Sequence, residues 1–97
     1  MIRHCVMFRW KDEMPVAWID EVEAALATLP AAIPAIASYS FGRDIGVNTG
    51  NQQFVVVADF ATVDDYLVYR DHPDHQTLIN ERIRPILAGR AAVQHEI

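Results

Sequence analysis

The sequence predicts an α+β fold, in which four antiparallel strands form one sheet and helices cover one of its faces. Two observations favour this class. Apolar residues recur in some segments with the period of two that is typical of strands, and in the segments between them at the three- or four-residue spacing of helices. The order along the chain is strand, helix, strand, strand, two helical segments and strand. A sheet with its helices segregated to one face is the α+β arrangement.

Size and composition limit the classes of function. The 97 residues are expected to form one domain, residues 1–97, and 52% of them are hydrophobic, which supplies ample material for a core. The net charge of −5 argues against a nucleic-acid partner, which needs clustered basic residues, and against an anionic membrane surface. The single cysteine, Cys5, excludes an intramolecular disulfide and suits a reducing compartment. No signal peptide or membrane span is visible, so we expect a cytoplasmic protein.

The first half of the chain predicts a strand, a helix and a second strand. Residues 2–10 alternate with a period of two and are expected to form the first strand. Residues 15–29 carry apolar side chains at helical spacing, and Pro30 and Pro34 are expected to end this helix because proline cannot continue it. Residues 36–43 alternate again and predict the second strand. The predicted inner stripe of the helix is Trp18, Ile19, Val22, Ala25, Leu26 and Leu29.

The second half predicts a loop, a strand, two helical segments and a last strand. Residues 44–52 are rich in turn formers, whereas residues 54–60 are apolar on both faces and give the strongest strand pattern. Thr62 and Asp65 resemble a capping box that starts a helix reaching about residue 71. The features predicted after it are a helix from Pro73 to about Leu87 with a kink at Pro85, a helix stop at Gly89, and a strand that alternates Ala91, Val93, His95 and Ile97.

This order is the βαββαβ pattern of the ferredoxin-like arrangement. Right-handed crossovers place both helical connections on the same side of the sheet, so the other face has no cover within one chain. That face is not polar, because residues 54–60 are apolar on both sides and Cys5 and Met7 oppose Val6 and Phe8 on the first strand. An exposed apolar patch of this kind is unfavourable in a monomer. We therefore expect a homodimer in which two open sheet faces meet.

The segment Asp71–His75 separates the two helical patterns of the second half. Pro73 suits a first helical position, His72 falls at the cap, and Asp74 lies in the first turn, where the helix dipole favours an acid. His75 begins an apolar stripe at helical spacing, so its imidazole is expected to face the interior. The stripe consists of Leu78, Ile79, Ile83 and Ile86.

Several segments of the chain resemble the stress-responsive A/B barrel (Dabb) family. They follow the family's order along essentially the whole chain and are Met1–Lys11, Ile33-Pro34, Asp59-Phe60, and Tyr69 followed by His72-Pro73-Asp74-His75. The resemblance implies a dimeric α+β barrel, with two ferredoxin-like subunits whose sheets face each other. One plant branch of the family is similar to polyketide cyclases, which use a histidine acid–base pair between sheet and helices without metal or cofactor.

Carried over residue by residue, the resemblance implies that His75 is the catalytic histidine, that His4 supports it, and that Tyr69 belongs to the pocket. A pocket tyrosine on the first helix of the plant branch has no counterpart, because Leu26 occupies its place, which removes a polar group that could bind a phenolic or polyketide substrate. The side chains expected to line the substrate pocket are Val6, Phe8, Leu26, Val56, Ala58, Val63 and Leu78.

The chemistry of such a pair needs little else. His4 shares its predicted strand face with Val6 and Phe8, and His75 lies on the inner face of the last helix, so both are expected to border one cavity. Burial keeps an imidazole neutral, and a neutral imidazole abstracts a proton next to a carbonyl group. Tyr69 is expected to orient the base or to hydrogen-bond an enolate. The structural alternative is that His4 bonds a neighbouring loop and that His75 is a satisfied core histidine.

Three classes of function remain open at this point. The first is a cofactor-free cyclase, lyase or isomerase that acts on a small carbonyl or polyketide-like compound. The second is a non-catalytic stress-associated dimer that binds a hydrophobic small molecule. The third is a cofactorless monooxygenase or a haem-binding protein of the same architecture, with His75 as axial ligand. No resident metal is expected, because His72 and His75 straddle a helix start without a third ligand in view.

Overall fold

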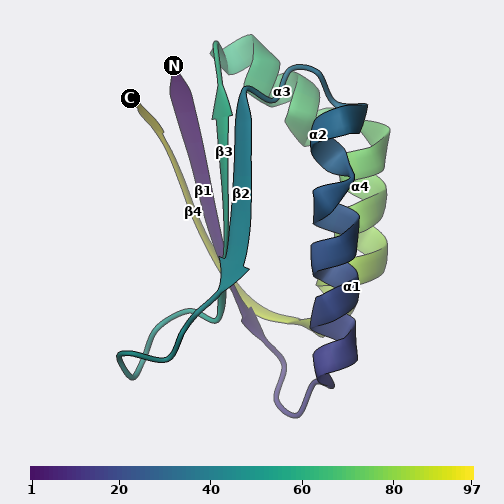
Figure 1. The fold of residues 1–97 in the computed structure, drawn as a ribbon, viewed down its shortest axis with the longest axis vertical. Helices are drawn as coiled ribbons and strands as arrows, with labels where there is room; N and C mark the ends of the chain where they lie inside the picture. The colour runs from purple at the N-terminus through teal and green to yellow at the C-terminus, as the bar shows by residue number, and fades with distance from the viewer.

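The structure has two layers, a four-stranded antiparallel sheet and a layer of helices against one face of it (Figure 1). It is a computed structural model that describes all residues from 1 to 97. The strands are β1 (Ile2–Trp10), β2 (Ser38–Arg43), β3 (Phe54–Phe60) and β4 (Leu87–Glu96). The helices are α1 (Val16–Ala27), α2 (Leu29–Ala32), α3 (Val63–Asp71) and α4 (Pro73–Leu78), followed by a π turn at Ile79–Ile83 and a 3-10 turn at Arg84–Ile86. The predicted α+β class, with its order of elements, is confirmed.

The first and last strands of the chain are neighbours in the sheet. The strand order is β2-β3-β1-β4, and β1 pairs antiparallel with both β3 and β4. Both chain ends therefore lie at the same end of the sheet (Figure 1), where the amide of Ile97 donates to the carbonyl of Met1 at 3.0 Å. No helix in the structure combines the length and apolarity that crossing a membrane requires.

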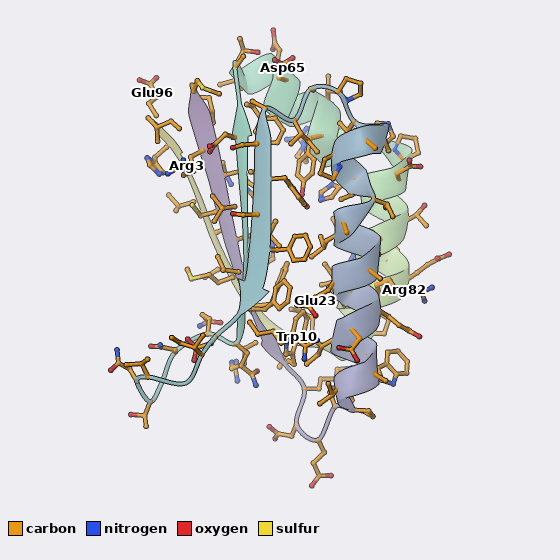
Figure 2. The ribbon with its side chains drawn as sticks, in the orientation of Figure 1. Arg3, Trp10, Glu23, Asp65, Arg82 and Glu96 are labelled. Atoms are coloured by element: carbon orange, nitrogen blue, oxygen red, sulfur yellow. The ribbon has the colours of Figure 1, made fainter.

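The face of the sheet toward the helices carries the core. The even-numbered side chains of β1 from His4 to Trp10 are buried on this face, and Figure 2 shows Trp10 between the sheet and the helices. The buried apolar core consists of Val6, Phe8, Trp10, Val22, Leu26, Leu29, Ile33, Phe54, Val56, Ala58, Phe60, Tyr69, Leu78, Ile83 and Ile86. Six residues of the two predicted helical stripes belong to this core, namely Val22, Leu26, Leu29, Leu78, Ile83 and Ile86, and Ile19 and Ala25 pack against it.

An exception is Trp18, which was predicted on the inner stripe of the first helix and is 42% exposed. The first turn of α1 extends beyond the ends of the strands (Figure 1), so no strand lies opposite this side chain. A second correction concerns Pro30, which does not end the helical region. The chain starts the short helix α2 there, and Pro30 lies in its first turn, where a missing N–H is tolerated.

Both predicted caps in the second half are confirmed. The hydroxyl of Thr62 accepts a hydrogen bond from the amide of Asp65 at 3.1 Å and caps α3. Nδ1 of His72 accepts one from the amide of Asp74 at 3.1 Å and caps α4. The side chain of His72 therefore has a local structural role.

The helix predicted from Pro73 to about Leu87 is wrong in its second half. Regular α4 ends at Leu78, and the chain continues through the π turn and the 3-10 turn before β4 begins at Leu87. Pro85 explains this change, because it lacks an N–H and its ring crowds the preceding turn. Gly89 is not a helix stop but a strand residue. A Cβ atom there would lie 2.9 Å from the guanidinium of Arg9, so glycine leaves room for that side chain.

The opposite face of the sheet has no cover within the chain. In the strand register, Cys5 lies between Val57 and Val93, and Met7 between Val55 and Ala91, so all these side chains share the open face. Val93 is 54% exposed. The open face therefore presents an apolar centre to its surroundings.

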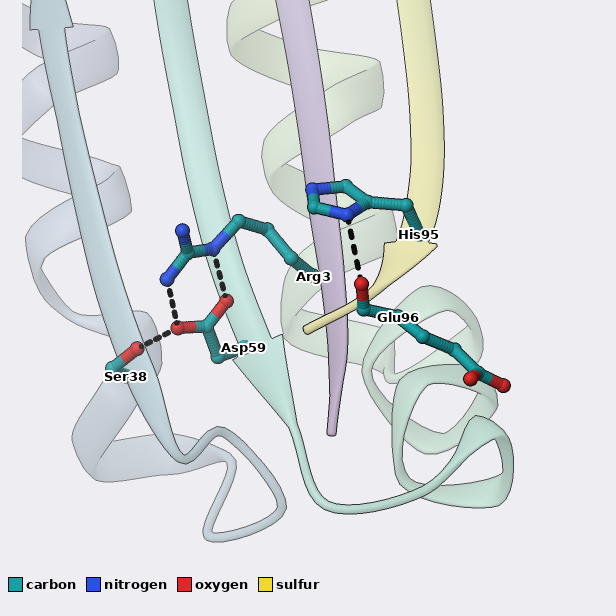
Figure 3. A network of polar contacts seen from close by, with 5 residues as sticks. All are labelled: Arg3, Ser38, Asp59, His95 and Glu96. Atoms are coloured by element: carbon teal, nitrogen blue, oxygen red, sulfur yellow. Dashed lines mark hydrogen bonds and ion pairs between the residues drawn. The ribbon is translucent and has the colours of Figure 1, made fainter.

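One polar network occupies the end of this open face (Figure 3). The guanidinium of Arg3 donates to both carboxylate oxygens of Asp59 at 2.8 and 3.0 Å, and the hydroxyl of Ser38 donates to the same carboxylate at 2.7 Å. These hydrogen bonds, first that of Arg3 and then that of Ser38, lower the pKa of Asp59 to about 2. The network satisfies a carboxylate that is itself nearly buried.

Candidate active site between sheet and helices

A cavity of about 390 Å³ lies between the sheet and the helical layer. Its volume falls in the range of roughly 300–1,000 Å³ that small-molecule sites occupy. The strands contribute His4, Val6, Phe8, Val56, Leu87 and Arg90 to its lining. The helical segments contribute Leu26, Tyr66, Tyr69, Arg70, His75, Gln76, Leu78, Ile79, Ile83 and Arg84.

The cavity brings together most of the residues that the sequence singled out. His4, His75 and Tyr69 all line it, as do five of the apolar residues expected there, Val6, Phe8, Leu26, Val56 and Leu78. Two others do not. Ala58 is completely buried beside His4 and Tyr39 in the strand register, and Val63 lies in the first turn of α3 with 56% of its surface exposed.

His75 is held in one tautomer by the backbone. Its Nδ1 lies 3.0 Å from the carbonyl oxygen of Arg70, and because a carbonyl only accepts, Nδ1 carries the proton of the neutral ring. Nε2 is then left with a free lone pair. The imidazole also packs on the ring of Tyr69, with 4.1 Å between the centroids. Burial is the main cause that lowers the pKa of His75, so the ring is neutral near pH 7.

His4 carries the complementary tautomer. The side-chain amide of Gln94 donates from Nε2 to Nδ1 of His4 at 2.8 Å, which places the proton of the neutral ring on Nε2. The side chain of His4 is only 4% exposed. Its Nε2 has no hydrogen bond within the chain but is not fully buried, so it remains open to a ligand or water. Burial, followed by the positive charge of Arg90 and then the nearby imidazole of His75, lowers the pKa of His4 to about 4.

Two tyrosines surround this pair. Tyr69 bonds Tyr39 through the two hydroxyl groups at 3.0 Å, and burial raises the pKa of Tyr69 to about 12, so it stays protonated. The centroid of its ring is 4.1 Å from that of His75 and 6.2 Å from that of His4. Tyr66 lies nearer to His4, at 5.1 Å. Sequence analysis did not select Tyr66, although its spacing of three from Tyr69 places both on one helical face.

Gln94 and Arg90 are the other functional candidates that sequence analysis missed. They lie opposite His4 and Phe8 in the register of β4 with β1, on the face toward the helices. The alternation of Ala91 and Val93 was correctly identified as one face of a strand, but those apolar side chains face the open side. Arg90 and Gln94 lie on the other side of β4, where Arg90 lines the cavity and Gln94 bonds His4.

The arrangement combines a base with a hydrogen-bond donor on one cavity. Nε2 of His75 accepts a proton and Nε2–H of His4 donates one, and both rings are neutral near pH 7. The structure contains no group of three or more His, Cys, Asp or Glu side chains suited to hold a metal ion. The remaining lining is apolar apart from two tyrosines, three arginines and Gln76.

Comparisons with known proteins agree with this architecture. The chain is similar to a dimeric ferredoxin-like protein of unknown function from Thermobifida fusca, with 45% identity over 99% of this chain and 90% of that one and a TM-score of 0.92. A second dimeric protein of unknown function, from Bacteroides fragilis, shares 25% identity over 99% and 95% of the chains, with a TM-score of 0.87. The hydroxynitrile lyase of Passiflora edulis shares the fold at 21% identity, over 99% and 92% of the chains, with a TM-score of 0.86. A search of the curated proteins gives no match.

The family model of the stress responsive A/B barrel domain matches residues 2–97, which is nearly the whole chain. The strand order, the helical layer on one face and the His-Pro-x-His segment at the start of α4 fit that assignment. The chain belongs to the stress-responsive A/B barrel (Dabb) family.

Proposed function

We propose that this chain is a cofactor-free acid–base enzyme, a lyase, cyclase or isomerase, that acts on a small carbonyl compound. One observation carries the proposal: two neutral histidines with complementary tautomers line the same cavity, which is large enough for a small molecule. The hydrogen bonds of Arg70 and Gln94 support each tautomer independently. Packing of a core alone does not require an acceptor on His75 and a donor on His4 that line one cavity.

The step begins with His75. Its Nε2 takes a proton from the carbon next to a carbonyl group, the C–H electron pair moves into the new C=C bond, and the carbonyl oxygen becomes an enolate oxygen. Nε2–H of His4 donates a hydrogen bond to that oxygen as its negative charge develops. The protonated His75 then returns the proton to carbon or to a leaving group. A positioned base of this kind contributes about 10²- to 10⁴-fold to the rate.

Tyr69 supports the base in this proposal. Its ring packs on the imidazole of His75 and its hydroxyl is bonded to Tyr39, so it fixes the orientation of the base. Leu26 lines the cavity at the place of a pocket tyrosine in the cyclase-like plant branch of the family, so the wall there offers only apolar contact. The pocket therefore favours compounds with an apolar body.

The test measures deuterium exchange next to the carbonyl of small ketones and keto acids in D₂O, followed by proton NMR. The wild-type protein should exchange the proton of at least one such compound. The variant His75→Ala should abolish exchange, and His4→Ala should reduce it less, because His4 assists and does not abstract. A control is Thr77→Ala, since Thr77 lies on α4 two residues from His75 but is exposed and does not line the cavity, so exchange should be unchanged.

The contradicting result is equally clear. If both alanine variants lose several kcal/mol of stability, and no carbonyl or polyketide-like compound shifts the melting temperature of the wild type, the histidines are structural. The catalytic proposal is then wrong, and the chain is a non-catalytic member of its family.

We propose further that the active form is a homodimer joined through the open sheet faces. The apolar centre of that face, with Val57 and Val93 beside Cys5, supports this proposal, and so does the dimeric state of the similar proteins from Thermobifida fusca and Bacteroides fragilis. The single chain has a mass of 10.9 kDa, and light scattering at micromolar concentration should give twice this mass. A mass equal to that of the single chain contradicts the proposal.

A further inference from the structure

The charged residues of the cavity differ from those of the molecule as a whole. The chain has eight lysine and arginine residues against thirteen acids, with a net charge of −5. Three arginines nevertheless line the cavity, and no aspartate or glutamate does. The lining of this cavity is therefore positively charged, although the protein as a whole is acidic. Such a charge distribution favours a negatively charged ligand.

The three arginines differ in how far they are already neutralised. Arg70 forms a two-pronged bond with the carboxylate of its neighbour Asp71, at 2.9 and 3.1 Å. Arg84 and Arg90 form no ion pair within the chain, so their guanidinium groups remain available to a ligand.

Arg90 is the better placed of the two. It lies opposite Phe8 in the register of β4 with β1, four residues before Gln94, which bonds His4. Its charge acts on both His4 and His75, so its guanidinium belongs to the same site. Arg84 lies in the 3-10 turn that closes the helical side of the cavity. A ligand between sheet and helices meets both.

We propose that the ligand of this cavity is a small carboxylic acid with an apolar body, whose carboxylate is bound by Arg90 with help from Arg84. The planar guanidinium matches the two oxygens of a carboxylate, which favours a carboxylic acid over a compound with a single charged oxygen. The apolar body packs on Phe8, Leu26 and Ile83. This inference rests on the proposed function for the location of the carbonyl group, which lies at His4 and His75, and adds the charged end of the substrate.

Binding of two matched compounds tests the proposal without any need for turnover. The probes are 4-phenylbutyrate and its neutral amide, 4-phenylbutyramide, titrated into ¹⁵N-labelled protein and followed by NMR shifts. The wild type should bind the carboxylate about tenfold more tightly, because a charge-assisted hydrogen bond adds to the shared apolar contact. Arg90→Gln should abolish this preference while leaving the affinity for the amide unchanged, and Arg90→Lys should retain part of it.

The matched control is Arg82→Gln. Arg82 lies in the π turn two residues before Arg84 but points away from the cavity (Figure 2). The Arg82 variant should therefore prefer the carboxylate to the amide as strongly as the wild type does. Equal affinity for the two probes, binding of neither, or equal effects of the Arg82 and Arg90 variants would overturn the proposal. A carboxylate preference without any deuterium exchange would contradict the proposed function alone, whereas exchange without a preference would contradict this inference alone.

Discussion

Acidification should destabilise this protein, and His4 contributes to the loss in a defined range of pH. Burial lowers the pKa of His4 from 6.5 to about 4 in the folded chain. A base whose pKa is lower in the folded state contributes stability that is complete above its unfolded pKa and is lost as the pH falls toward its folded pKa. The contribution of His4 is therefore fully present at pH 7 and is lost between about pH 6.5 and pH 4.

The size of this loss follows from the pKa difference of about 2.5 between the two states. Each pKa unit corresponds to about 1.36 kcal/mol, so complete protonation costs about 3 kcal/mol. At pH 4.5 about 2 kcal/mol of it has been lost. His4 is only 4% exposed, but it borders the cavity, where water screens the charge and lowers this cost. A small domain has a total stability of roughly 5–15 kcal/mol, so the effect is readily measured.

Urea unfolding at pH 7, 5.5 and 4.5 provides the measurement, with His4→Gln as the comparison. The variant keeps a polar side chain for Gln94 but cannot titrate, so its free energy of unfolding should fall by about 2 kcal/mol less than that of the wild type between pH 7 and 4.5. His75 titrates in both proteins, and its contribution cancels in the difference. Equal losses in the two proteins would refute the buried, neutral state of His4.

Further predictions concern the open face and the local caps. Val57→Glu should convert the proposed dimer to monomer or unfold the protein, because a buried unpaired charge costs several kcal/mol, whereas Val63→Glu, exposed in the first turn of α3, should do neither in light scattering. Thr62→Ala should lower the free energy of unfolding by about 1 kcal/mol through loss of the α3 cap, as measured in urea. The pKa of Asp59 is lowered, so its stabilising effect is present above about pH 4 and lost as the pH falls toward 2. The wild type should therefore lose about 1 kcal/mol more than Asp59→Asn between pH 5 and 2.5, after discounting for the exposure of Arg3.

The sequence predicted the fold because its periodic patterns are local and strong. The alternation in residues 2–10 and 54–60 and the caps at Thr62 and His72 each depend on neighbours within a few residues. Where a long-range contact decides the outcome, prediction was weaker. Trp18 has the spacing of a core residue, but whether a strand lies opposite it depends on where β1 ends.

The candidate site was predicted only in part for a similar reason. The apolar stripe that His75 begins indicated its direction, but its tautomer depends on the carbonyl of Arg70, which only the folded chain brings near. Gln94 lies 90 residues from His4 in sequence, so its contact with His4 depends on strand register. The spacing of Arg90 and Gln94 places both on one face of the last strand and could have indicated a polar site. The apolar alternation of Ala91 and Val93 instead defined the opposite face of that strand.

Long-range proton–nitrogen correlation spectra of the uniformly ¹⁵N-labelled protein at pH 7 test the central claim most directly, because they report which ring nitrogen of each histidine is protonated. Assignment uses the variants His4→Gln and His75→Gln, each of which removes one pattern. The structure predicts that His75 is neutral with its proton on Nδ1, where the carbonyl of Arg70 accepts it, and that His4 is neutral with its proton on Nε2. A charged ring at either position, or a proton on Nε2 of His75, would contradict the assignment of His75 as base and His4 as donor.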